Sequence, residues 1–297
     1  MEPIQPIQER LPLDEDRIDE IVAETFPASD APAWNATHAG EPVHQTRAAQ
    51  PTQEAMRAQL RADLERLGQP STSSEGRRRY REDAVARALL ASGHAVIREP
   101  VDANLVVRTL ECEQLGSMRE ASCVVVGARY DEDDISGIAA LLAVSRALAA
   151  VDLVRNVRFV AFANTAGTSG SEQYVERLSK AGASVHAMLS LDRIDLARDH
   201  EASLLVVGNR ASRGLARRAA RAFEMASRIT VRSVALPSWV PGVAASDHAS
   251  FWRYGWPAVM VSDGPLWRVR SPDAPDVDRI AAAVPGLIAA VTRLAEA

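Results

Sequence analysis

Residues 122–142 read SCVVVGARYDEDDISGIAALL and predict a strand, a loop and a helix in succession. The apolar run Cys123–Val126 is typical of a central strand that is covered on both faces. An acidic segment, Asp131–Asp134, follows directly, and the small and aliphatic side chains after it predict a helix over about 136–150. Polar residues placed directly after a strand lie at the carboxyl edge of a sheet, where open α/β sheets bind their ligands.

Strands and helices alternate through the rest of the chain. Strands are predicted at 94–99, 104–111, 122–127, 156–163, 187–191, 203–208 and 257–262. Helices are predicted at 136–150, 171–181, 211–226, 245–254 and 276–296. This alternation favours an α/β fold with a mixed, mostly parallel central sheet and helices on both faces. A functional site is then expected at the strand ends, which fall at 127–134, 163–170, 192–195 and 262–271.

Two further helices are predicted before the first strand. Thr52 is suited to cap the first of them. The second covers about 75–92 and is expected to turn Tyr80 inward. Its basic run, RRRYR at 77–81, is interpreted as a solvated helix face because the two acidic residues that follow neutralise part of it.

The first fifty residues differ in composition from the rest. They are rich in proline and in acidic and amide side chains, which is typical of a disordered tail. One short amphipathic helix is expected within them, with Ile18, Ile21, Val22 and Phe26 on its apolar face. The predicted organisation is therefore a tail over 1–50 and one α/β domain over 51–297.

The composition of the chain excludes two classes of partner. The net charge of −5 argues against a nucleic-acid partner, which requires a basic surface. No apolar run reaches the length needed to cross a bilayer, so no membrane partner is expected. The first residues lack the basic and apolar regions of a signal peptide, and a cytoplasmic location is expected.

The strand ends carry a family resemblance. Residues 127–131, GARYD, resemble the GAHYD strand end of metallopeptidase family twenty-eight, the di-zinc aminopeptidases and their relatives. Residues 132–142, EDDISGIAALL, are similar to that family's GADDNASGVAALLE. Further likenesses lie at 159–164, 188–194 and 241–252, where FVAFAN, MLSLDRI and PGVAASDHASFW resemble FVAFANEE, MLSLEMIG and PGVDWSDHWSFW. The resemblance covers roughly residues 54–297 in collinear order and implies a zinc-exopeptidase-like fold.

The resemblance also implies a site chemistry. In the family, two zinc ions flank a bridging water and are held by histidines and carboxylates, one of which bridges both metals. The metals lower the pKa of the water, and a free glutamate accepts its proton.

This chain departs from that pattern at nearly every position. Arg129 stands at the first histidine, and Glu132 stands at the bridging aspartate after a shortened loop. Thr165 and Ala166 stand at the catalytic glutamate and its neighbouring ligand, and Arg270 stands at the final histidine. Arginine stays protonated and offers no lone pair to a metal. We therefore expect no catalytic residue, no bound metal and no other cofactor.

A degenerate cleft remains. Asp192 keeps a liganding residue type in place, and Glu132 is the other residual candidate for a metal ligand. Asp131, Asp247 and His248 stand at supporting positions and are interpreted as hydrogen-bonding residues of the scaffold. The remaining cleft residues are Asp133 and the two arginines, and Ser136 is expected to cap the helix that follows.

Two functions compete on this evidence. The first is a catalytically inactive, peptidase-like protein that binds an unidentified peptide or protein partner or has a regulatory role. The second is an active metallo-exopeptidase with a shifted acidic site, built from Asp131, Glu132, Asp133, Asp192 and His248, which would use zinc.

The arginines predict a compensating contact. Carboxylates that converge on a site without metals repel one another. A guanidinium group suits a carboxylate and stays charged when it is partly buried. We therefore expect Arg129 or Arg270 to form a salt bridge with Glu132, Asp192 or a nearby aspartate of the cleft.

Overall fold

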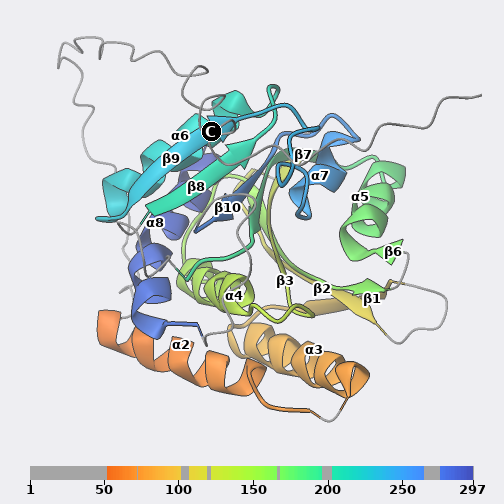
Figure 1. The fold of residues 1–297 in the computed structure, drawn as a ribbon, viewed down its shortest axis with the longest axis vertical. Coiled ribbons are helices and arrows are strands. Elements are labelled where there is room, and N and C mark those ends of the chain that lie inside the picture. Colours follow the sequence, from red (N-terminus) through yellow and green to blue (C-terminus); the bar gives the residue numbers. More distant parts are fainter. Residues whose placement is uncertain are drawn as a thin grey trace, which may run out of the picture. The chain divides into compact units, whose positions relative to one another are not determined.

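The computed structural model describes residues 52–71, 73–101, 107–118, 122–165, 168–195, 203–263 and 275–296. Its centre is an eight-stranded sheet (Figure 1). From one edge to the other, the strands are β1 (Val96–Pro100), β2 (Arg108–Gln114), β4 (Asn156–Phe162), β3 (Ser122–Arg129), β7 (Ser184–Leu191), β10 (Ala258–Ser262), β8 (Ser203–Gly208) and β9 (Thr230–Ala235). The pairs β3–β4, β3–β7, β7–β10 and β8–β9 are parallel, and the other three are antiparallel, which confirms the mixed sheet.

Helices cover both faces of this sheet. They are α2 (Gln53–Leu67), α3 (Ser74–Ala91), α4 (Ser136–Leu148), α5 (Gly170–Lys180), α6 (Arg213–Ala226), α7 (His248–Trp252) and α8 (Val277–Ala295). Side chains of β3 alternate between the faces: Val124 and Val126 join the apolar cluster of α2, α3, α4, α6 and α8, whereas Cys123 and Val125 join the cluster of α5 and α7. Burial on both faces explains the continuous apolar runs of the central strands.

Sequence periodicity located most of these elements, with two omissions. The edge strand β9 was not predicted, although Val231 and Val234 are buried while Thr230 and Arg232 are exposed. The short hairpin of β5 (Asn164–Thr165) and β6 (Thr168–Ser169) was also not predicted, because two-residue strands leave no periodic signal.

The helix α3 corrects two predictions. Tyr80 does not face inward, since 43% of its surface is exposed. Arg81 does not belong to a solvated face, since it is buried and donates hydrogen bonds to the carbonyl oxygens of Leu67, Tyr130 and Glu132. Both differences have one cause: Arg81 and Val85, four residues apart, define the buried stripe, and Tyr80 lies outside it.

The predicted tail over 1–50, with its short helix, lies outside the described residues. Within the described ranges, no helix is long and apolar enough to cross a bilayer.

Candidate functional site

The carboxyl ends of the parallel strands β3, β4, β7 and β10 meet at one edge of the sheet. The start of α4 packs directly against the end of β7. A Cβ atom on Gly137 would lie 2.3 Å from the carbonyl oxygen of Asp192, so only glycine allows this approach. The contact brings the acidic loop after β3 next to Asp192.

Arg129 is the last residue of β3, and its guanidinium group is shared between two carboxylates. Its Nη1 atom pairs with Glu132, three residues along the chain. Its Nε atom lies 3.3 Å from Oδ2 of Asp247, whose side chain is only 1% exposed. The compensating salt bridge predicted for Arg129 is therefore confirmed, whereas Arg270 lies outside the described residues.

The charges of this cluster and its burial shift the pKa values of Arg129 and Asp247, both upward. Burial lowers the pKa of Arg129, but the carboxylates of Asp247 and Glu132 outweigh it, so the net shift is upward. Burial raises the pKa of Asp247, while Arg129 and the hydroxyl group of Ser171 act in the opposite direction. Arg129 thus remains a fixed positive charge at this edge of the sheet.

Asp131 connects two strand ends. Its Oδ2 atom accepts a hydrogen bond of 2.9 Å from the backbone N–H of Asn164, which follows β4. Its Oδ1 atom is buried and has no hydrogen-bond partner in the part of the chain that the structure describes. Burial raises the pKa of this carboxyl group. The contact with Asn164 agrees with the interpretation of Asp131 as a scaffold residue.

Asp192 directly follows β7, and the pKa of its carboxyl group is shifted. Burial, together with the negative charge of Glu132, raises the pKa of Asp192 to about 6. Arg193 and Arg129 oppose this shift without cancelling it. Arg129 thus forms ion pairs with Glu132 and Asp247, whereas it acts on the pKa of Asp192 through its charge alone.

His248 and Asp133 point to other partners. The Nε2 atom of His248 lies 2.8 Å from the carbonyl oxygen of Val243, and burial lowers the pKa of the imidazole to about 4. Its ring meets Trp252 edge-on at 4.6 Å between centroids. The Asp133 side chain is 77% exposed and forms an ion pair with Arg77 at 3.2 Å.

Ser136 does not cap α4 as predicted. It is the first residue of the helix, and Oδ1 of Asp134 accepts hydrogen bonds from both its backbone N–H and its hydroxyl group, at 2.9 and 2.6 Å. The Ser136 hydroxyl oxygen accepts a third hydrogen bond, from the backbone N–H of Ile194 at 2.9 Å. Ser136 therefore connects the loop after β3 to the loop after β7.

The sequence model of peptidase family M28 matches residues 121–282, which is more than half of the chain and includes the carboxyl ends of β3, β4, β7 and β10.

The chain belongs to peptidase family M28.

Solved structures with the M28 type of fold show the same architecture. The LapA aminopeptidase of Legionella pneumophila has a TM-score of 0.67 at 13% identity, over 89% of this chain and 80% of that one. LapB of the same organism has a TM-score of 0.66 at 16% identity, over 82% and 73%. A structure from Bacteroides vulgatus, described as a putative Zn-dependent exopeptidase, has a TM-score of 0.58 at 14% identity, over 81% and 95%. At these identities the likeness establishes the fold alone.

A curated relative is the uncharacterized protein YfbL of Escherichia coli. It is 24% identical over 185 residues, which is 49% of this chain and 56% of YfbL. The match therefore takes in little more than half the length of that relative.

The residues present do not fit the zinc pair that the M28 resemblance implies. The two carboxylates nearest to Arg129, Glu132 and Asp247, are already bound to its guanidinium group. No cluster of three or more His, Cys, Asp or Glu side chains suited to a metal occurs among the described residues. At Thr165 only the backbone is described, paired with Thr168, while Ala166 and Arg270 lie outside the described ranges.

Sequence reasoning missed two groups of supporting residues. Ser171, at the start of α5, bonds Asp247 and lies 3.0 Å from the hydroxyl oxygen of Ser250. Arg81 holds the loop after β3 through the carbonyl oxygens of Tyr130 and Glu132. The spacing of Arg81 and Val85 was the available signal for the second group, whereas the serine contacts depend on the packing of α5 against α7.

Proposed function

We propose that this M28 family member is a catalytically inactive, peptidase-like protein that uses the peptidase fold for binding or regulation. One observation carries the proposal: Arg129, a permanent cation, pairs with Glu132. The family resemblance aligns Arg129 with a metal-binding histidine and Glu132 with the bridging aspartate. Arginine offers no lone pair, so this position cannot contribute to a metal shell.

The remaining groups support the same conclusion. A metal at this edge would have to displace a guanidinium group from two carboxylates, one of them almost fully buried. Threonine at position 165 supplies no carboxylate to accept a proton from a bound water. Hydrolysis by the family mechanism thus lacks both its metal shell and its general base.

The shifted-site alternative gains no support from the geometry. Asp133 turns to Arg77 at the surface, and His248 bonds the carbonyl oxygen of Val243. Asp131 is committed to the backbone of Asn164. These side chains therefore have different partners instead of a shared metal position.

Zinc content and peptidase turnover test the proposal together. We expect purified full-length protein, dialysed against zinc and then against buffer, to retain far less than one equivalent of metal by mass spectrometry. We also expect no release of nitroaniline from aminoacyl p-nitroanilides with added zinc or cobalt. The matched variant Asp192→Ala should behave identically. Two retained equivalents of zinc, with turnover that Asp192→Ala abolishes, would overturn the proposal.

The binding role requires its own measurement. An array of peptides with free N-termini, probed with the full chain, should yield peptides whose retention is lost in Asp192→Ala. The variant Asp152→Ala removes an exposed carboxylate outside the strand-end site and should retain the same peptides. Equal loss in both variants, or no retained peptide, would contradict a binding function for this site.

A further inference from the structure

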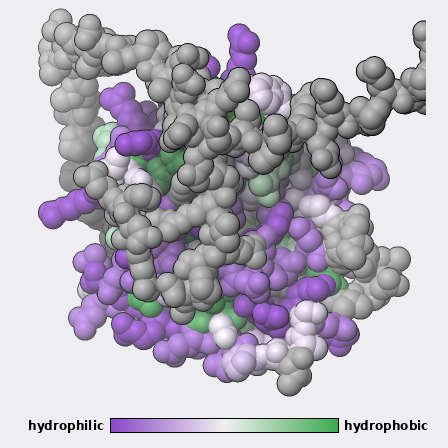
Figure 2. All heavy atoms as spheres, viewed as in Figure 1, coloured by the Kyte–Doolittle hydropathy of each residue, from purple (hydrophilic) through white to green (hydrophobic). Residues whose placement is uncertain are grey.

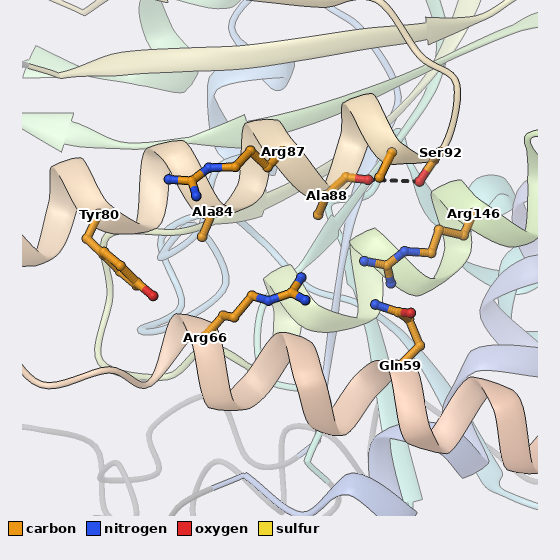
Figure 3. A pocket seen from close by; sticks show the side chains of 9 residues that line it. Gln59, Arg66, Tyr80, Ala84, Arg87, Ala88, Ser92 and Arg146 are labelled. Carbon is orange, nitrogen blue, oxygen red and sulfur yellow. Dashed lines mark hydrogen bonds between the residues drawn. The ribbon is translucent and has the colours of Figure 1, made fainter.

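A polar groove lies between α2 and α3, away from the strand ends (Figure 3). Its volume is about 660 Å³, which is within the range of small-molecule sites. Figure 2 shows that hydrophilic side chains predominate on the surface around these helices. We call this feature the α2–α3 groove and define it by Gln59, Arg66, Tyr80, Arg87 and Arg146, with alanines of α3 on one wall.

The charge of the groove has one sign. Arginines from three helices line it: Arg66 from α2, Arg87 from α3 and Arg146 from α4. Among the described residues, no aspartate or glutamate lines it. A concave surface with charges of a single sign concentrates ligands of the opposite charge.

The three arginines differ in their partners. Arg146 is held by the buried carboxylate of Asp63 through two bonds of 2.6 and 2.9 Å. Arg66 and Arg87 are exposed, and neither guanidinium group has a carboxylate or other hydrogen-bond partner among the described residues. Two guanidinium groups in one groove thus have their full donor capacity available.

The remaining lining residues suit an organic ligand. Ala84 and Ala88 provide an apolar wall, and Tyr80 presents an exposed phenol ring at the end of the groove near Arg87 (Figure 3). Figure 3 also shows Arg66 extending from α2 along the gap toward Arg146 and Gln59. Cationic donors therefore occur at both ends, with an aromatic face at one of them.

We propose that the α2–α3 groove binds a small organic phosphate. A phosphate monoester offers three terminal oxygens and up to two negative charges. It can therefore bind two unpaired guanidinium groups at once, which a single carboxylate does less well. The apolar wall and Tyr80 would contact the organic part. This site is independent of the strand-end site and of the inactivity proposed for it.

Calorimetry with the full-length chain tests this site. Phenyl phosphate is the probe because it joins one phosphate to one aromatic ring, and benzoate is its carboxylate counterpart. We expect saturable binding of phenyl phosphate, weaker binding of inorganic phosphate, and benzoate binding at least about tenfold weaker than phenyl phosphate.

Matched variants separate a site from general charge attraction. The double variant Arg66→Gln, Arg87→Gln should weaken phenyl phosphate at least about tenfold. The double variant Arg61→Gln, Arg217→Gln removes the same charge from exposed positions outside the groove and should change affinity by less than about twofold. Tyr80→Ala should weaken phenyl phosphate but not inorganic phosphate. Absence of binding, equal loss in both double variants, or equal affinity for benzoate would overturn the proposal.

Discussion

Arginine occurs in opposite states at the strand-end site and in the α2–α3 groove. Arg129 is bound to Glu132 and to the buried Asp247, so its charge is paired within the protein. Arg66 and Arg87 are exposed and have no carboxylate partner in the described chain. The comparison teaches that a charged residue indicates a ligand site only after its internal partners are known.

Removing Arg129 should have the largest effect on stability. Arg129→Ala leaves the buried carboxylate of Asp247 without its counter-charge and should lower the free energy of unfolding by about 3 kcal/mol. Urea denaturation followed by circular dichroism measures the loss, with Arg66→Ala as the control. A change below about 1 kcal/mol would break the comparison, because Arg129 would then be as dispensable as an exposed arginine.

The ion pair Asp63–Arg146 combines both situations: Arg146 is paired with a carboxylate, as Arg129 is, and it also lines the α2–α3 groove. Asp63→Asn should lower the free energy of unfolding by about 2 kcal/mol, because it breaks a bidentate pair with a buried carboxylate. The same variant frees Arg146 and should strengthen phenyl phosphate binding in calorimetry. Asp83→Asn, at an exposed aspartate, is the control, and unchanged stability in Asp63→Asn would contradict the proposed anchoring.

Asp192 gives a smaller effect that depends on pH. Its folded-state pKa, about 6, lies above the ordinary value of 3.8 because of burial and of Glu132. The folded state therefore binds the proton more tightly than the unfolded state, and this group's contribution to stability falls as pH rises through that interval. Asp192→Asn removes this pH dependence and should stabilise the protein relative to wild type by about 1 kcal/mol more at about pH 7.5 than at about pH 5. Parallel stability profiles for the two proteins would contradict the shift.

The unpartnered arginines should have the smallest effect. Arg66→Gln and Arg87→Gln should each change the free energy of unfolding by less than about 0.5 kcal/mol without ligand, because exposed side chains without ion pairs contribute little. Urea denaturation with excess phenyl phosphate should show stabilisation of wild type but not of the double variant. A loss of stability above about 1 kcal/mol without ligand would show that these arginines, like Arg129, stabilise the fold, and would contradict the comparison.

The sequence predicts the fold better than it predicts side-chain partners. The apolar runs at β3 and β4 predict buried strands, because burial on both faces of a sheet disfavours polar residues. The position of β10 between β7 and β8 is not encoded locally, since their pairing joins segments far apart in the chain. Likewise, the contact of Arg129 with Glu132 followed from charge and proximity, whereas the contacts of Arg81 with backbone carbonyls require the packed loop.

The place of β10 also determines when a nascent chain can complete its sheet. β7 and β8 end at Leu191 and Gly208, but the strand that pairs with both spans Ala258–Ser262. On the ribosome, the facing edges of β7 and β8 stay unpaired until that last strand emerges, and open edges are templates for pairing with other chains. Final closure of the sheet is therefore delayed until Ser262, more than fifty residues after the end of β8, has been synthesised.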